Sequence, residues 1–474
     1  MLSASPADSW RALTVTDIDA LYERVRELHP GIRDPAAPDF SAKIDTAYAA
    51  ARKRAESAQS FSDWRAVTTS FMLSFRDGHT IFRPTVIPSR VRWPGFLIDS
   101  RGGHYYLRKS VAGEYGSMRL VSCDGVLIED LLRDRLDLLE ADWSKLPERI
   151  RQAWRLFVDY QLEGKPPILA CDVETAGKRE SLKLDWQPIS WVELGALVDV
   201  LSRQRSSTDA IRLTELQGAA FWIRLSSFGR ESELAAVETE LKRTVGRLRQ
   251  ARYIVFDLRG NRGGNSTWGE RIAEIVWGEK AVGARKLINT SPGGKYFRAS
   301  PQAAEQATAM ASAFEDDHMP ESFVRYWRGV AKMIAEAPDR DTALVRDPCC
   351  GPESKPPPLG IPPDALYRGK TFVLTDAGCF SSCVLVMNTL REMGATQVGE
   401  SSGQNEVYGE IAGPFTTPSG LARYSIPLSI IRQSRESLGG LAPDRQFDGP
   451  MDDIAALRKW IDRMGRERAT TRFP

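Results

Sequence analysis

The first part of the chain repeats apolar residues at helical spacing. One helix face collects residues three or four positions apart, namely Ile18, Leu21, Val25 and Leu28. The segment "HPGIRDPAAPD" breaks this pattern because proline and glycine disfavour helix interiors, and "FSDWRAVTTSFMLSF" resumes it behind a Ser62 cap. The pattern predicts an N-terminal helical arm over residues 1–85.

From about residue 86 short strands replace the helical pattern. "GFLIDS" and "YYLRKS" flank the turn "RGGH", and "ILACDVE" and "ESLKLDW" flank "TAGKR". Apolar and β-branched runs separated by glycine-containing turns are typical of antiparallel hairpins. Residues 86–190 are therefore predicted to form a β-rich module with one or two helices.

The period changes again near residue 218. "GAAFWIRLSSF" and "YIVFDL" are continuous apolar runs, and a helix face lies between them, formed by Leu234, Val237, Leu241, Val245 and Leu248. Runs without alternation indicate strands buried on both faces, as in a parallel βαβ unit. A third strand, "KTFVLTD" at 370–376, precedes a helix from about Ser381 to Met393, and "TQVGE" follows. The fold class is α/β, with this core over residues 191–474.

The core is interrupted at about residues 280–365. This segment is rich in alanine, proline and charge, and it ends in "PCCGPESKPPPLGIPP". Proline-rich sequence of this kind forms stiff connectors. We expect an inserted helical excursion that closes with such a connector.

Charge and hydropathy narrow the class of protein. Of 474 residues, 64 are Lys or Arg and 62 are Asp or Glu, which leaves a formal charge of +2. A balance this close to neutral predicts no nucleic-acid or anionic-membrane partner. No apolar stretch is long enough to span a bilayer, and "MLSASPADSW" does not resemble a signal peptide. The expected compartment is the cytoplasm as written, or the periplasm or exterior if a leader was removed.

The cysteines and histidines predict no metal site and no cofactor. The six cysteines have no CxxC spacing and the four histidines are far apart. Cys379 and Cys383 lie four positions apart across a predicted turn, so they can form a disulfide that locks this turn. The alternative, a buried Cys383 thiol acting as a small apolar residue, is the commoner arrangement.

"AGCFSSCVLVM" places Ser381 between a buried strand and the start of a helix. Helix starts expose unpaired N–H groups and a partial positive charge, which stabilise a developing anion. Such a turn suits a nucleophilic serine, although a serine here also acts as an ordinary helix cap.

Two further stretches bear on this choice. "DLRGNRGGN", 257–265, ends a neighbouring parallel strand in a glycine-rich turn, and "FRDGHTIFRP" places His79 in a turn. Taken singly, they are an ordinary tight turn and a solvated histidine. Together with Ser381 they predict one site at the carboxyl edge of the sheet.

These stretches resemble the C-terminal processing, or tail-specific, family of serine peptidases, which includes the tricorn core protease. The family pattern D-L-R-x-N-x-G-G is matched by Asp257, Leu258, Arg259, Asn261, Gly263 and Gly264. Its nucleophile and the following small residue fall on Ser381 and Ser382. Its G-E, D-x-H-T and G-x-x-P-D patterns fall on Gly399 and Glu400, on Asp77, His79 and Thr80, and on Gly440, Pro443 and Asp444. The resemblance covers roughly residues 60–85, 218–278 and 370–465.

The resemblance implies a crotonase-like spiral core, with a PDZ-like module in the β-rich middle that receives peptide ends along an edge such as 95–99. Many relatives use a Ser-Lys dyad, but "GESSGQNEVYGE" offers Gln404, whose amide cannot act as the base. The tricorn-like branch uses a histidine instead, which assigns His79 as base and Glu436 as the acid that orients it. Gly78 stands where tricorn has a serine.

The implied function is a serine endopeptidase acting on peptides or unfolded proteins. Ser381 is the expected nucleophile, and the expected oxyanion donors are the N–H of Ser382 and that of Gly263 or Gly264. The alternatives are a catalytically inactive peptide-binding or scaffolding member of the fold and another acyl-transfer chemistry on the same nucleophile. The sequence does not specify the natural substrate or the oligomeric state.

Overall fold

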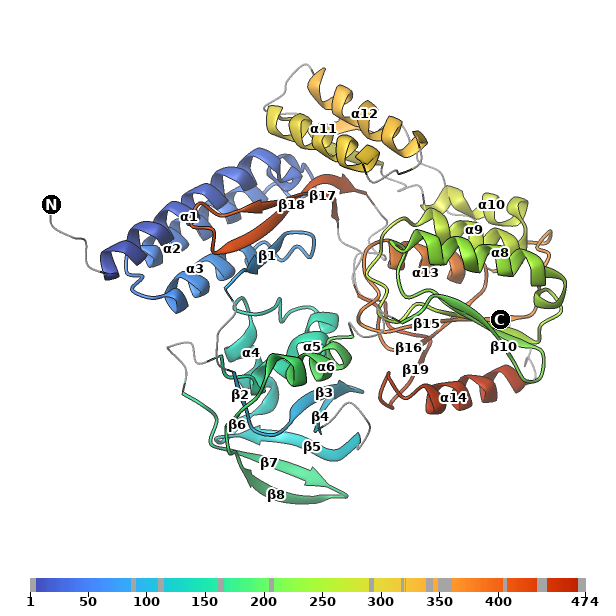
Figure 1. Cartoon of the computed structure of the whole chain (residues 1–474), viewed down its shortest axis with the longest axis horizontal. Helices are drawn as coiled ribbons and strands as arrows, with labels where there is room; N and C mark the ends of the chain where they lie inside the picture. Colours follow the sequence, from blue (N-terminus) through green and yellow to red (C-terminus); the bar gives the residue numbers. More distant parts are fainter. Residues whose placement is uncertain are drawn as a thin grey trace.

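The computed structural model describes residues 6–86, 91–109, 115–160, 166–203, 209–289, 294–316, 319, 321–337, 344–347, 360–403, 407–432 and 441–467. They form three lobes around separate apolar cores, which we call the core lobe, the helical lobe and the middle module (Figure 1). Within these residues, no helix combines the length and the apolar character needed to cross a membrane.

The core lobe is built on a six-stranded sheet in the order β10-β11-β12-β15-β16-β19. Its strands are β10 (Arg212–Leu216), β11 (Ala220–Arg224), β12 (Tyr253–Asp257), β15 (Lys370–Thr375), β16 (Thr396–Gly399) and β19 (Arg445–Gln446). All neighbours are parallel except β10 and β11. The predicted βαβ unit is confirmed, because β11 and β12 are parallel and a helix joins them.

Helices cover both faces of this sheet. One face carries α8 (Glu231–Leu248), α9 (Thr267–Trp277), α10 (Glu279–Asn289) and α13 (Ser382–Glu392), and the other carries α14 (Ile454–Arg466). Along β11, Phe221 and Ile223 join the first core while Ala220 and Trp222 join the second. Strand side chains alternate between faces, so both registers must be apolar.

The helical lobe combines segments from three parts of the chain. Its helices are α1 (Pro6–Leu28), η1 (Pro30–Arg33), α2 (Phe40–Ala55), α3 (Phe61–Leu73), α11 (Pro301–Asp316) and α12 (Glu321–Ala335). Its five-stranded sheet contains β1 (Ile81–Pro84), β13 (Lys295–Arg298), β14 (Leu344–Arg346), β17 (Tyr408–Thr416) and β18 (Ala422–Ile431). One core unites the N-terminal helices, the inserted segment and the β17-β18 hairpin.

The predicted Ser62 cap of α3 is wrong by two positions. The helix begins at Phe61, and the Ser60 hydroxyl accepts the N–H of Asp63. Both serines precede the same apolar run, and spacing alone did not distinguish them.

The middle module contains a second six-stranded sheet, in which β6 pairs with β5 and the others follow the order β3-β4-β5-β7-β8. The strands of this sheet are β3 (Leu97–Arg101), β4 (His104–Arg108), β5 (Tyr115–Cys123), β6 (Val126–Leu127), β7 (Ala170–Thr175) and β8 (Lys178–Lys183), and a separate two-stranded sheet pairs β2 (Arg92–Trp93) with β9 (Gln187–Pro188). Its helices are α4 (Ile128–Leu136), α5 (Leu146–Gln152), η2 (Ala153–Phe157) and α6 (Trp191–Leu201). A disulfide between Cys123 and Cys171 joins β5 to β7.

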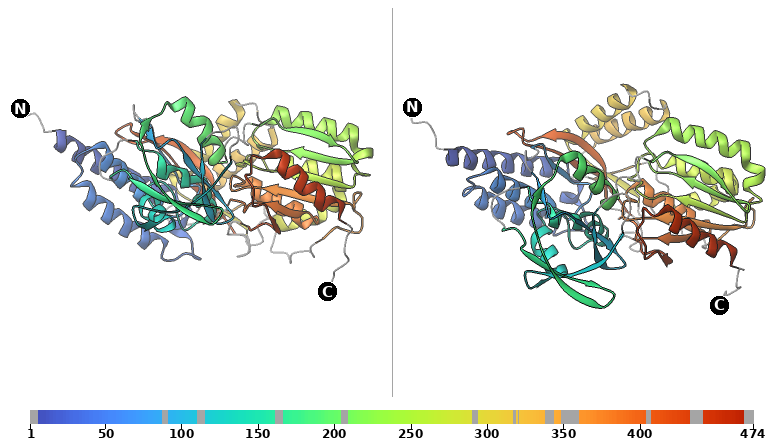
Figure 2. Two further views of the ribbon diagram at one scale, coloured as in Figure 1. Left: turned by 90° about the horizontal axis from the view of Figure 1, so that it is seen from below. Right: turned by 60° about the horizontal axis from the view of Figure 1, so that its bottom comes forward.

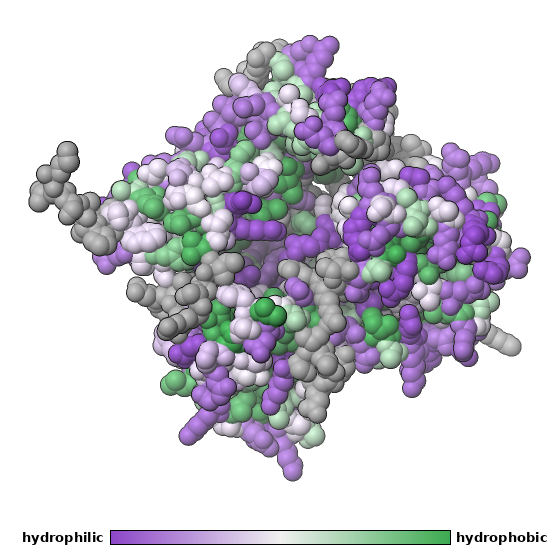
Figure 3. All heavy atoms as spheres, viewed as in Figure 1, coloured by the Kyte–Doolittle hydropathy of each residue, from purple (hydrophilic) through white to green (hydrophobic). Residues whose placement is uncertain are grey.

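The three lobes surround a shared centre. Figure 2 shows α1 and α14 at opposite ends of the long axis, with the middle module beneath the junction. In the space-filling view, the middle of this face is hollowed and hydrophilic side chains gather in the hollow (Figure 3). The carboxyl edge of the core sheet therefore faces segments of the other two lobes.

Candidate active site

Ser381 occupies a sharp turn between β15 and α13. Its backbone has φ +57° and ψ −127°, a conformation that costs a non-glycine residue on the order of 1–3 kcal/mol. The turn is fixed by hydrogen bonds on both sides, since Phe380 N–H donates to the Asn261 carbonyl at 3.0 Å and Cys379 N–H donates to the Asp376 carbonyl at 3.0 Å. Strained backbone held in this way is typical of functional turns.

The glycine-rich turn after β12 packs directly against Ser381. A Cβ added at Gly263 would lie 3.0 Å from both the Ser382 nitrogen and the Ser381 Cβ, and the φ of Gly263 is +98°. Any side chain at Gly263 would therefore cover the first N–H of α13. The glycine keeps this N–H accessible.

The same turn leaves two backbone donors available. Gly263 N–H donates to Asn261 Oδ1 at 2.8 Å, and the Ser382 hydroxyl donates to the Gly264 carbonyl at 2.7 Å. In the described part of the chain, the N–H groups of Gly264 and Ser382 have no acceptor. An anion forming beside Ser381 would meet these two donors and the start of α13.

His79 reaches the site from the helical lobe, in the turn between α3 and β1. Asp77 holds this turn, because its Oδ1 accepts the His79 N–H at 3.1 Å and its Oδ2 accepts the Thr80 hydroxyl at 2.7 Å. Burial opposes the ionisation of Asp77, but His29, His79 and Thr80 more than offset it and lower the pKa of Asp77 to about 2. Asp77 thus stays ionised and positions the backbone of the turn, not the imidazole ring.

The imidazole of His79 faces Ser381. His79 Nε2 lies 3.4 Å from Ser381 Oγ across 302 positions of sequence, and the Phe380 ring packs 4.9 Å from the imidazole between ring centres. This separation is long for a hydrogen bond. The structure therefore brings Ser381, Ser382, Gly263, Gly264 and His79 into one place.

Burial sets the protonation of His79. Burial lowers the pKa of His79 below the ordinary value of 6.5. The charges of Asp77 and Glu410 and the Tyr408 carbonyl act in the opposite direction and raise this pKa, but burial has the larger effect. His79 Nδ1 is buried and makes no hydrogen bond of normal geometry within the described residues. A neutral imidazole with Nε2 toward a hydroxyl can accept its proton near neutral pH.

The residues of the D-L-R pattern stabilise the end of β12, directly before the glycine-rich turn. The Asp257 carboxylate is fully buried and accepts from Trp222 Nε1 at 3.0 Å, while its charge pairs with Arg224 and Arg259. Burial alone would raise the pKa of Asp257, but the two guanidinium groups hold it far below its usual range. These residues fix the end of β12, and the glycine-rich turn that lies against Ser381 follows directly.

Asp376 ties the two turns together. It is fully buried directly after β15, and its Oδ1 accepts the N–H of Gly260 at 2.8 Å and of Gly378 at 2.9 Å. Burial raises the pKa of Asp376 to about 6, and the Glu400 charge adds to this effect while Arg203 opposes it. One carboxylate oxygen thus joins the glycine-rich turn to the nucleophile turn.

Glu400, the acid of the G-E pair, anchors the same region to the middle module. Arg203 pairs with Glu400 at 3.1 Å and with Asp99 of β3 at 3.2 Å. Glu400 Oε2 also accepts the Ala377 N–H at 3.2 Å. Glu400 and Arg203 therefore link three segments, namely β16, the turn that contains Ser381, and β3.

Three residues of the sequence-based prediction lie outside the described residues, namely Gln404, Glu436 and Gly440. Glu436 as the acid partner of His79 stays a prediction. Among the described acids, Glu410 of β17 was missed from the sequence, since nothing in the chain order placed β17 beside His79. Glu410 also pairs with Lys295.

A disulfide brackets the nucleophile. Cys379 and Cys383 are bonded to each other and both are fully buried. Of the two alternatives left open by the sequence, the structure has the disulfide. It closes the loop containing Ser381 and Ser382 on both sides of the turn. The pairing of Cys123 with Cys171 was missed because 48 positions separate them.

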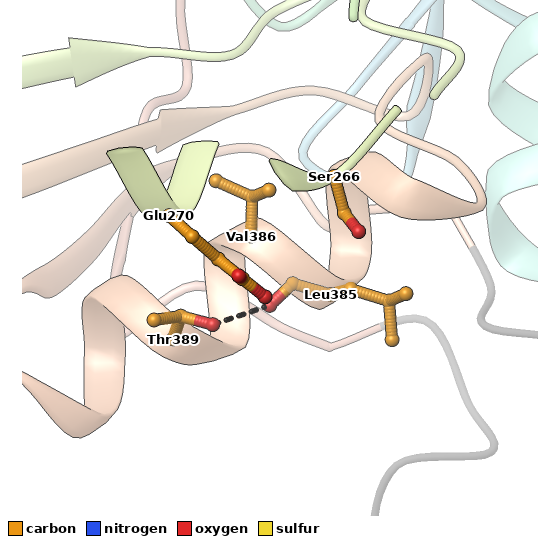
Figure 4. Close-up of a pocket in the computed structure, with 5 residues that line it drawn as sticks. All are labelled: Ser266, Glu270, Leu385, Val386 and Thr389. Carbon is orange, nitrogen blue, oxygen red and sulfur yellow. Dashed lines mark hydrogen bonds between the residues drawn. The ribbon is translucent and has the colours of Figure 1, made fainter. Parts of the chain in front are cut away.

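A small cavity of about 50 Å³ lies beside the site between α9 and α13 (Figure 4). It is lined by Ser266, Glu270, Leu385, Val386 and Thr389, and the Thr389 hydroxyl donates to the Leu385 carbonyl at 3.2 Å. The cavity is too small for a peptide side chain of ordinary size and includes neither Ser381 nor His79. Within the described residues there is no cluster of three or more potential metal ligands.

Comparison with known proteins shows a similarity to one peptidase family over part of the chain. Residues 221–444 match the model of peptidase family S41. The structure of mature CPAF is similar at a TM-score of 0.61 and 13% identity, covering 96% of this chain and 97% of that one. CPAF complexed with lactacystin gives 0.62 and 13%, covering 96% and 98%. No curated protein sequence matches the chain.

Residues 221–444, which make up 224 of the 474 residues, are therefore similar to peptidase family S41, and the chain is a serine-type peptidase. The tail-specific family assignment made from the sequence is thereby confirmed, as is a mixed α/β fold with several sheets. At 13% identity the similarity to CPAF shows a shared fold and carries no assignment of individual residues.

The first prediction concerns the Cys379–Cys383 disulfide. Replacing Cys379 and Cys383 together by alanine should lower kcat on a peptide substrate about tenfold, because the turn bearing Ser381 becomes less preorganised. Reductant should have the same effect on the wild-type protein. Peptidase assays with and without dithiothreitol measure both.

The matched control replaces Cys123 and Cys171 by alanine in the middle module. This variant should lose stability but keep the kcat of the folded fraction. Equal kcat for the oxidised wild type and the Cys379→Ala/Cys383→Ala variant would show that the disulfide does not hold the nucleophile.

Proposed function

We propose that the protein is a serine endopeptidase in which Ser381 attacks the peptide carbonyl and His79 acts as the base. The observation that carries this proposal is the approach of His79 Nε2 to Ser381 Oγ, 3.4 Å apart, at the start of α13. No Lys side chain is needed in this scheme. The substrates are peptides or unfolded proteins that enter the hollow between the lobes.

The reaction follows from the positions of these groups. His79 takes the proton of the Ser381 hydroxyl as the oxygen attacks, and later passes it to the leaving amine. The amine then leaves, and the acyl group remains on Ser381 as an ester until water, activated by the same imidazole, hydrolyses it. The attack by Ser381 and the later attack by water each require a neutral His79 at the start, and burial of the ring favours this form.

The oxyanion is stabilised by the N–H groups of Ser382 and Gly264. Gly263 is the less suitable member of the glycine pair, because its N–H already donates to Asn261. Its role is to leave the Ser382 N–H uncovered. Removal of one such donor typically costs about 10²–10³-fold in kcat.

The acid that assists His79 is assigned in two parts. Glu436 is proposed as the residue that orients the imidazole through Nδ1, the buried ring nitrogen that makes no hydrogen bond of normal geometry within the described residues. Glu410 acts at longer range, because its charge raises the pKa of His79. Both carboxylates favour the imidazolium that forms during attack.

We propose a crotonase-like spiral core for residues 191–474, with the insertion at about 280–365, and a PDZ-like role for residues 86–190. The helical arm, residues 1–85, completes the site by supplying His79. β3 lies at a sheet edge but is buried against α5 and η2. A peptide joining β3 would have to displace these elements, whereas the exposed β8 edge is open.

The competing candidate is an inactive binding protein of the same fold. It is favoured by the long distance between His79 Nε2 and Ser381 Oγ. Turnover of any peptide that depends on Ser381 excludes this candidate.

The second prediction separates the two adjacent serines. Ser381→Ala should reduce kcat/KM on denatured casein at least about 10³-fold, because the nucleophile is lost. Ser382→Ala keeps its backbone N–H and loses only the hydroxyl bond to Gly264, so kcat/KM should fall by about tenfold or less. Full activity of Ser381→Ala with loss in Ser382→Ala would move the nucleophile by one position.

The third prediction concerns pH. The value of kcat/KM should rise with pH as His79 loses its proton, with a midpoint below 6.5 because the pKa of His79 is lowered. Glu410→Gln should move this midpoint to lower pH, since Glu410 raises the pKa. His79→Gln should lower the plateau by about 10²–10⁴-fold.

Asp376 supplies the control for the pH profile, because its pKa of about 6 lies in the same range. In Asp376→Asn the acid limb should persist if His79 causes it. A midpoint near 9, or a midpoint unmoved by Glu410→Gln, would contradict the assignment of His79 as the base.

A further inference from the structure

Two exposed arginines without an acidic partner lie beside the proposed catalytic groups. Arg262 sits in the glycine-rich turn between Asn261 and Gly263, and Arg83 lies on β1, four positions after His79. Neither forms a hydrogen bond or ion pair within the described part of the chain, although most arginines there do. Their guanidinium groups are thus available to a ligand.

The two arginines belong to one electrostatic cluster. The positive charge of Arg83 acts on Arg262, as does that of Arg151 on α5, while Glu148 opposes them. Glu148 is itself paired with Arg151 at 2.9 Å. The net charge of the cluster is therefore positive, and its members come from all three lobes.

A third arginine adds to the same side. Arg83 is directly opposite Arg423 in the antiparallel pair of β1 and β18, and both side chains are exposed. Like charges facing each other across strands are destabilising. No acid relieves this repulsion within the described residues, so the pair has a cost to stability that an anionic ligand would remove.

Arg262 is surrounded by protein although its side chain reaches solvent. Surrounding protein lowers the pKa of Arg262 to about 10, yet its side chain is exposed to solvent. Hydrophilic side chains also gather in the hollow between the lobes (Figure 3). A peptide bound across Ser381 passes close to Arg262, because Gly263 adjoins Arg262 in the sequence and lies against Ser381.

We propose that Arg262 and Arg83 bind a carboxylate of the substrate, so that the peptidase prefers an acidic side chain within a few residues of the bond it cleaves. This inference rests on the proposed function and adds the substrate preference of the same site. Guanidinium groups bind carboxylates with paired N–H donors, and a partly enclosed position strengthens the attraction. A neutral or basic substrate residue at the same position would not reduce the electrostatic repulsion among the arginines.

The test uses pairs of quenched fluorescent peptides taken from the sites that the wild-type enzyme cleaves in denatured casein. Members of a pair differ only by Glu or Gln near the cleaved bond, and both ends are blocked by acetyl and amide groups. The wild-type kcat/KM should be about tenfold higher for the Glu peptide at low salt, and the ratio should decrease as salt screens the charges.

The readout in the variants is this Glu/Gln ratio, because an altered turn changes the rates on both peptides together. Arg262→Gln and Arg83→Gln should each bring the ratio toward one, and Arg262→Glu should invert it in favour of a Lys peptide. Arg243→Gln on α8, where the exposed Arg243 pairs with Glu240, is the control and should keep both the ratio and the rate.

Other outcomes overturn the inference. Equal wild-type rates on both peptides, or a ratio that survives both Arg262→Gln and Arg83→Gln, would show that the arginines do not select the substrate. A Gln peptide with a free C-terminal carboxylate distinguishes the source of the charge: preference for that peptide alone would refute an acidic side chain. Absence of Ser381-dependent cleavage of casein would refute the proposed function itself.

Discussion

The site depends on the hydrogen bonds that join the turns after two neighbouring parallel strands. Asp376 Oδ1 accepts an N–H from each turn, and Phe380 N–H donates to the Asn261 carbonyl between them. These bonds hold Ser381 in a backbone conformation that a free turn would avoid. They also keep Gly263 against the start of α13, so the donors around the nucleophile are set before any substrate binds.

The histidine reaches the nucleophile through a different set of constraints. His79 follows α3 in the helical lobe, and Asp77 fixes its turn while the core of that lobe is completed by the inserted segment and the β17-β18 hairpin. The distance between His79 and Ser381 therefore depends on how the helical lobe meets the core lobe. A small displacement of one lobe against the other would change the 3.4 Å separation of His79 Nε2 from Ser381 Oγ.

Much of this arrangement could be predicted from the sequence, because strong periodicity and adjacent motifs are local signals. The parallel strands β11, β12 and β15, the start of α13 and the glycine-rich turn all follow from apolar runs that end in small or polar residues. The cap at Ser60 and the acid Glu410 did not follow. The first depends on one of two similar serines, and the second on the pairing of β17 with β18, which no local pattern places beside His79.

Two further features could not be predicted from the sequence, namely the shared core of the helical lobe and the Cys123–Cys171 disulfide. Both depend on contacts between distant segments. The Cys379–Cys383 pair was foreseeable as an alternative because the two residues flank one turn. The exposed arginines gave no signal along the chain: Arg83 and Arg423 become neighbours only when β1 pairs with β18.

The central claim is that His79 activates Ser381 as a nucleophile. The most direct measurement is the labelling rate with a fluorophosphonate, followed by mass spectrometry of the labelled peptide. The account predicts a single adduct on Ser381 that forms faster as His79 becomes neutral and is nearly abolished in folded His79→Gln. An adduct on another residue, or equal labelling of the wild type and His79→Gln, would contradict it.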